Sequence, residues 1–251
     1  MKIALSRVLG ATLALTICVG ASASDLIVSA AASLTQAFQE LGPVFETANP
    51  GTRVQFNFGA SGALLQQIAK GAPADVFASA DQETMDQAQS QQLIQAANRR
   101  NFALNALVVI VPAVGGQAPK TLADLAQARY KRIAIGLPAS VPVGRYTRSV
   151  LEQAGLWSAI EPKIIGAQNV RQALDYTARG EVDAGFVYAT DAALMPDKVK
   201  VALTVPTPKP VLYPIAPITS STQADTAQKF VVFIQSAPAQ SVLAQYGFGK
   251  P

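Results

Sequence analysis

Residues 25–34 read DLIVSAAASL, and within this stretch an extended pattern changes into a helical one. Asp25 to Ala30 is an apolar, β-rich run that predicts a strand. From Leu34 as far as Ala48 the apolar residues recur at helical spacing, which predicts a helix. A strand followed directly by an amphipathic helix is the repeating unit of an α/β fold with mostly parallel sheets.

The same alternation continues along the chain. Further strands are predicted at residues 53–58, 75–79, 102–112, 132–136, 163–166, 182–188 and 199–203. Helices are predicted at 62–70, from 81 onward, at 121–128, 143–154 and 169–180, and, after a Pro-rich stretch at 206–217, at 223–235 and 239–246. In the first helix, Ser33 and Gln36 have the spacing of a capping box. Pro43 is expected either to kink or to divide that helix.

The chain reads as two halves of similar architecture, and the Pro-rich stretch is expected to lead back to the first of them. This pattern predicts two lobes joined by two crossings, which is the geometry of a hinge. We expect a signal peptide at residues 1–24, the first part of lobe 1 at 25–104, lobe 2 at 105–209, and a return to lobe 1 at 210–251.

The N-terminal segment predicts export. Lys2 and Arg7 precede an apolar run at residues 8–20, and small residues follow at 21–24, as in a cleavable secretory signal. The run is shorter than the roughly 20 residues that a membrane-spanning helix needs. Cys18 leaves lipid attachment as an alternative, although it is preceded by a large residue and belongs to the apolar run. We therefore expect a periplasmic protein with no direct membrane insertion.

Beyond residue 24 the sequence contains no cysteine and no histidine. A disulfide framework, thiolate or imidazole ligands for a metal cation, and a histidine-based catalytic triad are therefore excluded. Without Lys2 and Arg7 the formal charge is +2, because 18 basic residues face 16 acidic ones. That charge is too small and too scattered for a nucleic-acid surface.

Four predicted strand-to-helix junctions are suited to binding an anion. They are residues 30–34, 59–62, 141–144 and 168–171. Open α/β sheets bind ligands beyond the carboxyl ends of their strands, where helix N-termini present free backbone N–H groups. Four such termini sum to roughly +2 elementary charges, enough to attract a dianion. Ser33, Ser61 and Tyr188 could add hydroxyl donors, but the alternatives are ordinary N-caps for the serines and a packed core ring for Tyr188.

The chain resembles the periplasmic molybdate-binding proteins, the substrate-capturing components of molybdate ABC transporters. The resemblance covers essentially the whole chain beyond the signal, including Gln245–Phe248. It is carried by residues 30–34 (AAASL), 71–75 (GAPAD), 79–82 (SADQ), 141–144 (VPVG), 169–174 (NVRQAL) and 187–192 (VYATDA).

The resemblance places the oxyanion contacts of that family on Ser33, Ser61, Val143, Val170 and Tyr188. The serines would use hydroxyl and backbone N–H groups, the two valines backbone N–H groups, and Tyr188 its hydroxyl. Many relatives carry alanine at the position of Val143, and the larger side chain affects the size of the cavity while leaving the backbone donor in place.

The resemblance also implies a two-lobed periplasmic binding protein of type II, with mostly parallel sheets and the ligand in the cleft between the lobes. It implies a monomer that is not an enzyme, needs no cofactor, binds no nucleic acid, and delivers molybdate to a membrane permease. Molybdenum would enter as the oxyanion and not as a metal cation. Tungstate, of nearly the same size, is expected to bind comparably.

Elementary chemistry favours a fully deprotonated oxyanion over a protonated one. Molybdate offers only acceptors, so a pocket of neutral donors satisfies it. Hydrogen phosphate would leave its proton facing donors, which is costly in a dry site. Sulfate has the right charge but is smaller, so a binding protein for sulfate or thiosulfate remains an alternative. An adhesin or scaffold, a third class, would bind no small anion.

Two arginines and one serine have alternative roles that the sequence leaves open. Arg145 and Arg171 are either direct counter-ions of the ligand or rim groups that steer it inward. A cation beside a helix N-terminus is disfavoured unless it is paired or solvated, which favours the second interpretation. Ser61 lies in a Gly-Ala-Ser-Gly-Ala sequence that resembles a nucleophile elbow, but no histidine is present to activate it. Asp75 and Asp81 are expected to be caps of a helix or loop.

Overall fold

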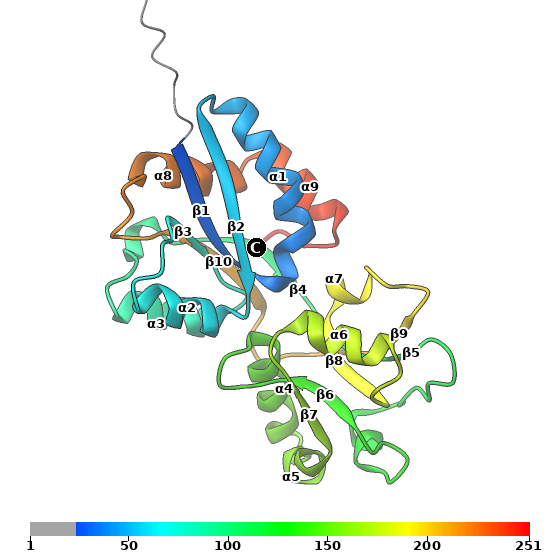
Figure 1. Cartoon of the computed structure of the whole chain (residues 1–251). Helices are drawn as coiled ribbons and strands as arrows, with labels where there is room; N and C mark the ends of the chain where they lie inside the picture. Colours follow the sequence, from blue (N-terminus) through cyan, green and yellow to red (C-terminus); the bar gives the residue numbers. More distant parts are fainter. Residues whose placement is uncertain (1–23) are drawn as a thin grey trace, which may run out of the picture.

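The computed structural model describes residues 24–251, which form two lobes, each built on a five-stranded mixed sheet flanked by helices (Figure 1). The two-lobed α/β fold is therefore confirmed. The predicted signal peptide falls on residues 1–23, outside the described residues, and Ser24 is the first residue of a strand. Within residues 24–251, no helix combines the length and hydrophobicity needed to cross a membrane.

The sheet of the first lobe has the order β2-β1-β3-β10-β4. Its strands are β1 (Ser24–Ala31), β2 (Thr52–Gly59), β3 (Val76–Ala78), β4 (Arg100–Asn105) and β10 (Val211–Pro217). β1 pairs in parallel with β2 and β3, whereas β10 pairs antiparallel with β3 and β4. Its helices are the 3-10 turn η1 (Ala32–Leu34), α1 (Thr35–Ala48), α2 (Ser61–Ala69), α3 (Gln82–Ser90), η2 (Ala96–Asn98), α8 (Ala224–Ile234) and α9 (Ala237–Gln245).

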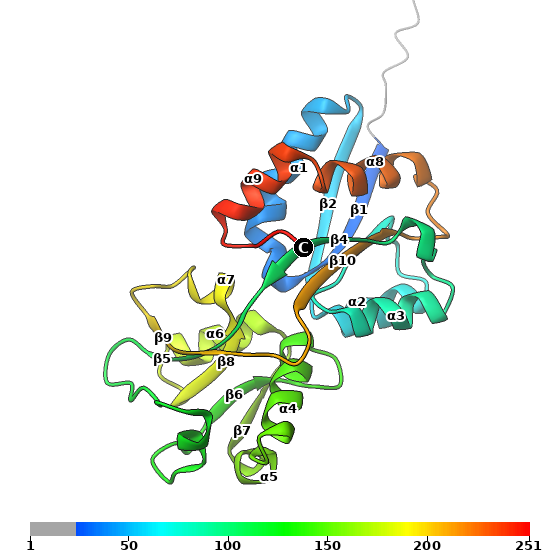
Figure 2. The same ribbon diagram turned by 180° about the vertical axis from the view of Figure 1, so that it is seen from behind.

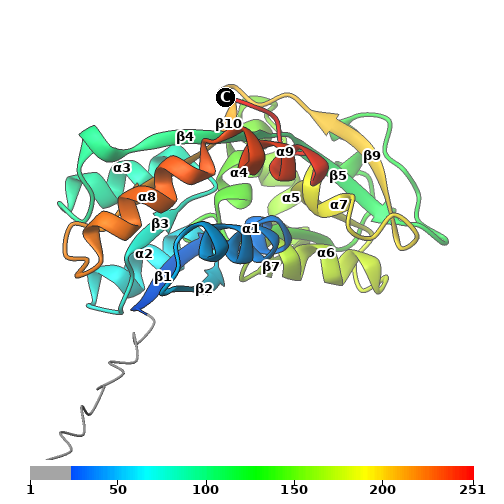
Figure 3. The same ribbon diagram turned by 90° about the horizontal axis from the view of Figure 1, so that it is seen from above.

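Helices cover both faces of this first sheet. α9 contacts both α1 and α8, and aromatic rings join α1 to α8. The three helices pack on one face, as the view from above shows (Figure 3). Phenylalanine rings fill the space beneath them, with Phe38 lying 5.9 Å from Phe102 and 6.1 Å from Phe230 between ring centroids. α2 and α3 cover the other face through a smaller apolar cluster around Phe77 and Met85. This packing holds the carboxyl ends of the parallel strands at the edge that meets the second lobe.

The sheet of the second lobe has the order β7-β6-β8-β5-β9. Its strands are β5 (Leu107–Pro112), β6 (Ile133–Gly136), β7 (Ile164–Ala167), β8 (Ala184–Tyr188) and β9 (Val199–Val205). β6 pairs in parallel with β7 and β8, and β5 is antiparallel to β8 and β9. Its helices are η3 (Leu122–Ala126), α4 (Pro142–Gln153), α5 (Trp157–Ile160), η4 (Glu161–Lys163), α6 (Val170–Ala178) and α7 (Ala189–Ala192).

Two predictions about the crossings between the lobes are wrong in detail. The strand predicted at residues 102–112 is two strands in different sheets, β4 and β5, with Ala106 between them. The Pro-rich stretch at 206–217 contains β10, which lies inside the first sheet. Its proline at 214 sits at a register irregularity, where the missing N–H is tolerated. From behind, both crossings are visible as β4 passes into β5 and β9 into β10 (Figure 2).

Three local expectations about helices also have a definite outcome. α1 runs undivided through Pro43. The helix predicted at 121–128 is the shorter 3-10 segment η3, which carries a capping box between Thr121 and Asp124. Asn169 caps α6 as predicted, because its side chain accepts a hydrogen bond from the backbone N–H of Gln172 at 3.0 Å.

Candidate functional site

A small cavity between the lobes brings together all five residues predicted to contact an oxyanion. Ser33 and Ser61 line it from the first lobe, and Val143, Val170 and Tyr188 line it from the second. The other lining residues come from the same four junctions, with Ala80 added from the loop after β3. The junctions face one another where η1 and α2 of the first lobe meet α4 and α6 of the second (Figure 1).

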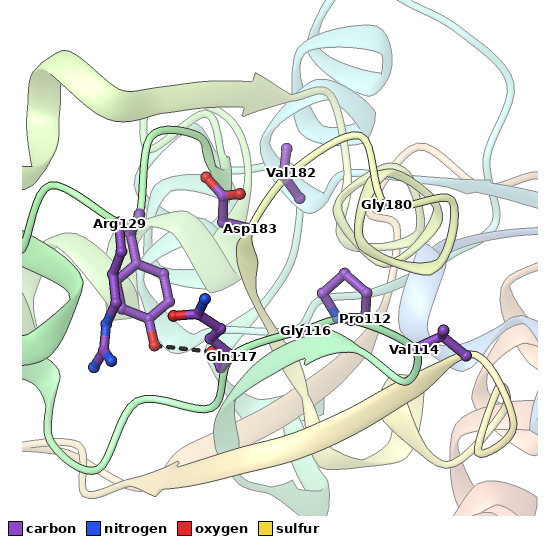
Figure 4. A pocket seen from close by; sticks show the side chains of 10 residues that line it. Pro112, Val114, Gly116, Gln117, Arg129, Gly180, Val182 and Asp183 are labelled. Carbon is purple, nitrogen blue, oxygen red and sulfur yellow. Dashed lines mark hydrogen bonds between the residues drawn. The ribbon is translucent and has the colours of Figure 1, made fainter.

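The cavity accepts only a compact occupant. The space open to the centre of a water-sized sphere is about 10 Å³, close to what one water molecule requires. A larger cavity of about 250 Å³ lies in the second lobe and is lined by the segment after β5 together with Arg129 and Asp183 (Figure 4). None of the five predicted residues lines that second cavity.

The Ser33 side chain does not form the predicted capping box. Ser33 lies inside η1, and α1 begins only at Thr35 after Leu34, which has helical dihedral angles and no side-chain cap. Its hydroxyl instead lies 3.0 Å from the hydroxyl of Tyr213 on β10. Both the capping box with Gln36 and the simple N-cap interpretation of Ser33 are therefore wrong, because the 3-10 turn directs the side chain to the sheet.

Ser61 is not an ordinary N-cap either. The N-cap of α2 is Ala60, and Ser61 is the first helical residue. The Ser61 hydroxyl oxygen accepts a hydrogen bond from the backbone N–H of Ala80 at 3.0 Å. A backbone N–H can only donate, so this bond uses the oxygen of Ser61 and not its hydrogen. The hydroxyl hydrogen of Ser61 is therefore free to point into the cavity.

Val143 and Val170 contribute backbone and not side chain. Their side chains are buried in the core, and each residue lies in the first turn of its helix. Backbone N–H groups of a first turn have no acceptor within the helix. The N-termini of α4 and α6 also carry partial positive charge toward the cavity.

Tyr188 ends β8 with its ring packed edge-on against Tyr213, 5.7 Å between ring centroids. Its hydroxyl lies 3.4 Å from the carbonyl oxygen of Ala80 in the other lobe, which makes a long hydrogen bond. Complete burial raises the pKa of the Tyr188 hydroxyl well above its usual value. The hydroxyl therefore keeps its proton and can act as a donor.

Arg145 joins the two lobes without lining the cavity. From α4, its Nε donates to Oδ2 of Asp81 at 2.7 Å and its Nη2 to Oγ1 of Thr84 at 2.6 Å. Asp81 is also the N-cap of α3, as the sequence predicts. Arg145 does not line the cavity, so it is not a counter-ion in contact with it. Its side chain is only 14% exposed, so it is not a solvated surface group either.

Arg171 forms a second contact between the lobes. Its Nη2 donates to the backbone carbonyl of Ser33 at 3.1 Å, and its Nε lies 2.6 Å from Oδ1 of Asp191. Burial raises the pKa of Asp191 to about 6, and the nearby Arg171 cation opposes that rise. Both arginines beside helix N-termini are thus paired with carboxylates, which removes the unfavourable interaction of a cation with the helix dipole.

A backbone contact completes the junction between the lobes. The N–H of Gly62 in α2 donates to the carbonyl of Ser140 before α4 at 3.0 Å. A Cβ atom on Gly62 would lie 2.7 Å from that carbonyl oxygen, so the close approach requires glycine. The backbone N–H of Gly62 therefore forms a hydrogen bond between the lobes.

The sequence missed three residues beside the site, Tyr213, Asn105 and Asp191. Tyr213 lies in the stretch interpreted as a Pro-rich return, and Asn105 carries no local pattern. Asp191 belongs to the segment 187–192 that carries the resemblance, but no role was assigned to it. Asp75 has a structural role and not a functional one, as expected, but it does not cap a helix. It accepts hydrogen bonds from the N–H of Ile27 in β1 and from the hydroxyl of Ser221.

The cavity wall offers hydrogen-bond donors and no arrangement for acid–base catalysis. Between residues 24 and 251, no three His, Cys, Asp or Glu side chains lie together in a way that would hold a metal cation. Ser61 is hydrogen-bonded to an amide and not to a base. The site can therefore satisfy an anion that presents only acceptors.

Comparison with known proteins agrees with this geometry. The family described as bacterial extracellular solute-binding protein matches residues 26–249. The molybdate-binding protein ModA of Escherichia coli is 35% identical over 247 residues, covering 95% of each chain. The ModA of Haemophilus influenzae is 32% identical and covers 91% of each chain.

A solved structure gives the same result. The periplasmic molybdate-binding protein of Azotobacter vinelandii superposes with a TM-score of 0.76 at 27% identity, covering 90% of this chain and 99% of the other. All of these relatives are solute-binding proteins and not enzymes, which removes the nucleophile-elbow interpretation of Ser61. The chain belongs to the family of bacterial extracellular solute-binding proteins.

Proposed function

We propose that this protein captures molybdate in the periplasm and delivers it to the membrane permease of an ABC importer. The convergence of Ser33, Ser61, Val143, Val170 and Tyr188 on one cavity between the lobes carries the proposal. These are the residues to which the family resemblance assigns the oxyanion contacts. Relatives whose names state molybdate binding match the chain over nearly its whole length, which supports the choice of ion.

In this proposal the ion is held by neutral donors from both lobes. Ser33 and Ser61 of the first lobe supply hydroxyl and backbone N–H groups. Val143 and Val170 supply the first-turn amides of α4 and α6, and Tyr188 supplies its hydroxyl. Because the donors come from both lobes, the ion binds the closed arrangement better than an open one and shifts the hinge toward closure.

The charge of the ion is balanced by dipoles and not by a contacting cation. Neither Arg145 nor Arg171 lines the cavity, and each is already paired with a carboxylate. Helix N-termini provide partial positive charge and unpaired N–H groups, which suit a fully deprotonated dianion. An ion that carries a proton would direct it at a donor, at a cost in a site without water.

Several further features belong to the same proposal. The protein is exported through the N-terminal signal, acts as a monomer, and binds tungstate comparably to molybdate. Lobe 1 comprises residues 25–105 and 210–251, and lobe 2 comprises residues 106–209. The first boundary lies one residue later than the predicted 104/105, because Asn105 ends β4 of the first sheet. The closed form is the one that the permease recognises.

The test is isothermal titration calorimetry on the protein purified from the periplasm, against sodium molybdate, tungstate, sulfate and phosphate. We expect one molybdate or tungstate per chain and much weaker binding of sulfate and phosphate. Thermal unfolding in excess molybdate should give a higher Tm, because a ligand that binds only the folded state stabilises it. Sulfate binding as tight as molybdate binding, or no binding of molybdate, would contradict the proposal.

A further inference from the structure

We propose that Tyr213 and Asn105 are positioning residues that fix the Ser33 hydroxyl as a hydrogen-bond donor into the cavity. Neither side chain lines the cavity. They act through a chain of three hydrogen bonds whose direction is set by groups that can only donate. The inference rests on the proposed function, because it assumes that Ser33 contacts the bound oxyanion.

The direction of the chain is set at Asn105, the last residue of β4. The backbone N–H of Ala106 donates to Oδ1 of Asn105 at 2.9 Å. A backbone N–H cannot accept, so this contact identifies the amide oxygen and leaves the NH2 group on the other side. That NH2 group donates to Oγ1 of Thr190 at 2.9 Å and to the Tyr213 hydroxyl at 3.2 Å.

The second step is at Tyr213. Its side chain is fully buried, and this burial raises the pKa of its hydroxyl well above the usual value, so the proton is retained. Because the Tyr213 oxygen accepts from Asn105, its single hydrogen is available for Ser33, whose Oγ lies 3.0 Å away. Tyr213 therefore donates and Ser33 accepts.

The third step follows at Ser33. A hydroxyl whose oxygen accepts from a fixed donor still has one hydrogen of its own to give. Ser33 lines the cavity, so that hydrogen is directed to the ligand. Ser61 reaches the same state by a different route, because its oxygen accepts from the backbone N–H of Ala80.

The chain of hydrogen bonds starts at a crossing between the lobes. Asn105 ends a strand of the first sheet, whereas Thr190 lies in α7, beside the second sheet. The bond between them therefore spans the lobes. The Asn105 amide that orients Tyr213 is therefore held at the crossing between the lobes, by Ala106 and by Thr190.

The test is the variant Tyr213→Phe, which removes the hydroxyl and keeps the ring contacts with Phe102, Tyr188 and Phe248. We expect the Kd for sodium molybdate to rise about fivefold to tenfold, the effect of losing one oriented hydrogen bond. The matched control is Tyr130→Phe. Tyr130 is also buried, and its replacement removes one hydrogen bond, to the carbonyl of Gln117 beside the cavity in Figure 4. The Kd of the Tyr130→Phe variant for molybdate should equal that of the wild type.

A double-mutant cycle separates positioning from a general structural role. In the Ser33→Ala background, Tyr213→Phe should change the Kd by less than about twofold, because the residue through which it acts is gone. An effect of the same size in both backgrounds would overturn the inference, as would a Tyr213→Phe variant that binds like the wild type.

The cycle also distinguishes this inference from the proposed function. If calorimetry shows that sulfate or another oxyanion binds in place of molybdate, the choice of molybdate is wrong and the same cycle is measured with the ion that binds. Coupling between Tyr213 and Ser33 then still supports the inference, and additive effects still overturn it. A wild-type protein that binds none of these ions contradicts both.

Discussion

At the residue scale, Tyr188 offers a direct test of the donor set. Its hydroxyl makes only a long contact with the carbonyl of Ala80, so Tyr188→Phe removes a ligand donor without breaking a strong internal bond. A hydrogen bond to a charged partner contributes about 1.5–3 kcal/mol, so the Kd for molybdate should rise about tenfold to a hundredfold. Calorimetry measures the change, and Tyr246→Phe, which loses a surface contact with Glu40, is the control. An unchanged Kd would remove Tyr188 from the site.

The buried carboxyl of Asp191 predicts a dependence of stability on pH. Its pKa rises from 3.8 to about 6 on folding because of burial, with Arg171 opposing the rise. Between these values the folded state binds more protons than the unfolded state, so the free energy of unfolding falls as pH rises through this window. The shift corresponds to up to about 3 kcal/mol of stability, which is present in full only below about pH 4 and is lost by about pH 6.

The variant Asp191→Asn isolates that contribution, because it removes the titrating group. Urea unfolding of both proteins between pH 4 and pH 7 should show the stability of the wild type, relative to the variant, decreasing with pH. The exposed Asp197→Asn should show no such trend. A difference that stays flat, or that grows with pH, would show that Asp191 is already ionised at pH 4 in the folded protein.

At the element scale, the N-terminus of α2 is where the helix meets the other lobe. Gly62→Ala places a Cβ 2.7 Å from the carbonyl oxygen of Ser140, against backbone that cannot move aside easily. Overpacking of this kind costs about 1–3 kcal/mol in the closed state, so the Kd for molybdate should rise about fivefold to a hundredfold. The stability of the ligand-free protein should not fall, because alanine favours the helix.

The matched control for this variant lies on the exposed face of the same helix. Gln66→Ala also changes the helix composition but faces solvent, so its affinity should equal that of the wild type. Calorimetry and urea unfolding of both variants separate closure from stability. A Gly62→Ala protein that loses stability and keeps its affinity would mean that the contact with Ser140 matters for folding and not for closure.

The elements that sequence predicted well are those with local signals. The strand at 25–30, the caps at Asp81 and Asn169, and the glycine and small residues at the junctions are all readable within a few positions. The four junctions converge because parallel strands present their carboxyl ends at one edge. The candidate site was therefore predictable as a set of helix N-termini.

The elements that sequence missed depend on distant partners. β10 was not predicted because prolines argue against an internal strand, and only its pairing with β3 and β4 shows where they are tolerated. The local spacing predicts that Ser33 caps a helix, yet its hydroxyl partner Tyr213 lies 180 positions away. Contacts of this range leave no periodicity in a single sequence, so neither Tyr213 nor Asn105 was detectable beforehand.

At the scale of the whole molecule, function depends on how firmly the lobes hold together. Arg145 donates from α4 of the second lobe to Asp81 and Thr84 of the first, and it is largely buried in that position. In an open arrangement these groups would be solvated separately. The ion pair therefore stabilises the closed state selectively, and any interaction with that property raises ligand affinity.

Arg145→Gln should accordingly weaken binding by hastening release. Truncating one partner of a buried, hydrogen-bonded ion pair mainly raises the dissociation rate, here by about tenfold or more, with little change in association. Stopped-flow fluorescence with molybdate measures both rates. Arg148→Gln is the control and should leave both rates unchanged, because Arg148 lies on the exposed side of the same helix, where it pairs with Glu152 and lies over the ring of Trp157. Equal dissociation rates for Arg145→Gln and the wild type would mean that the donors around the cavity hold the lobes together without help from this pair.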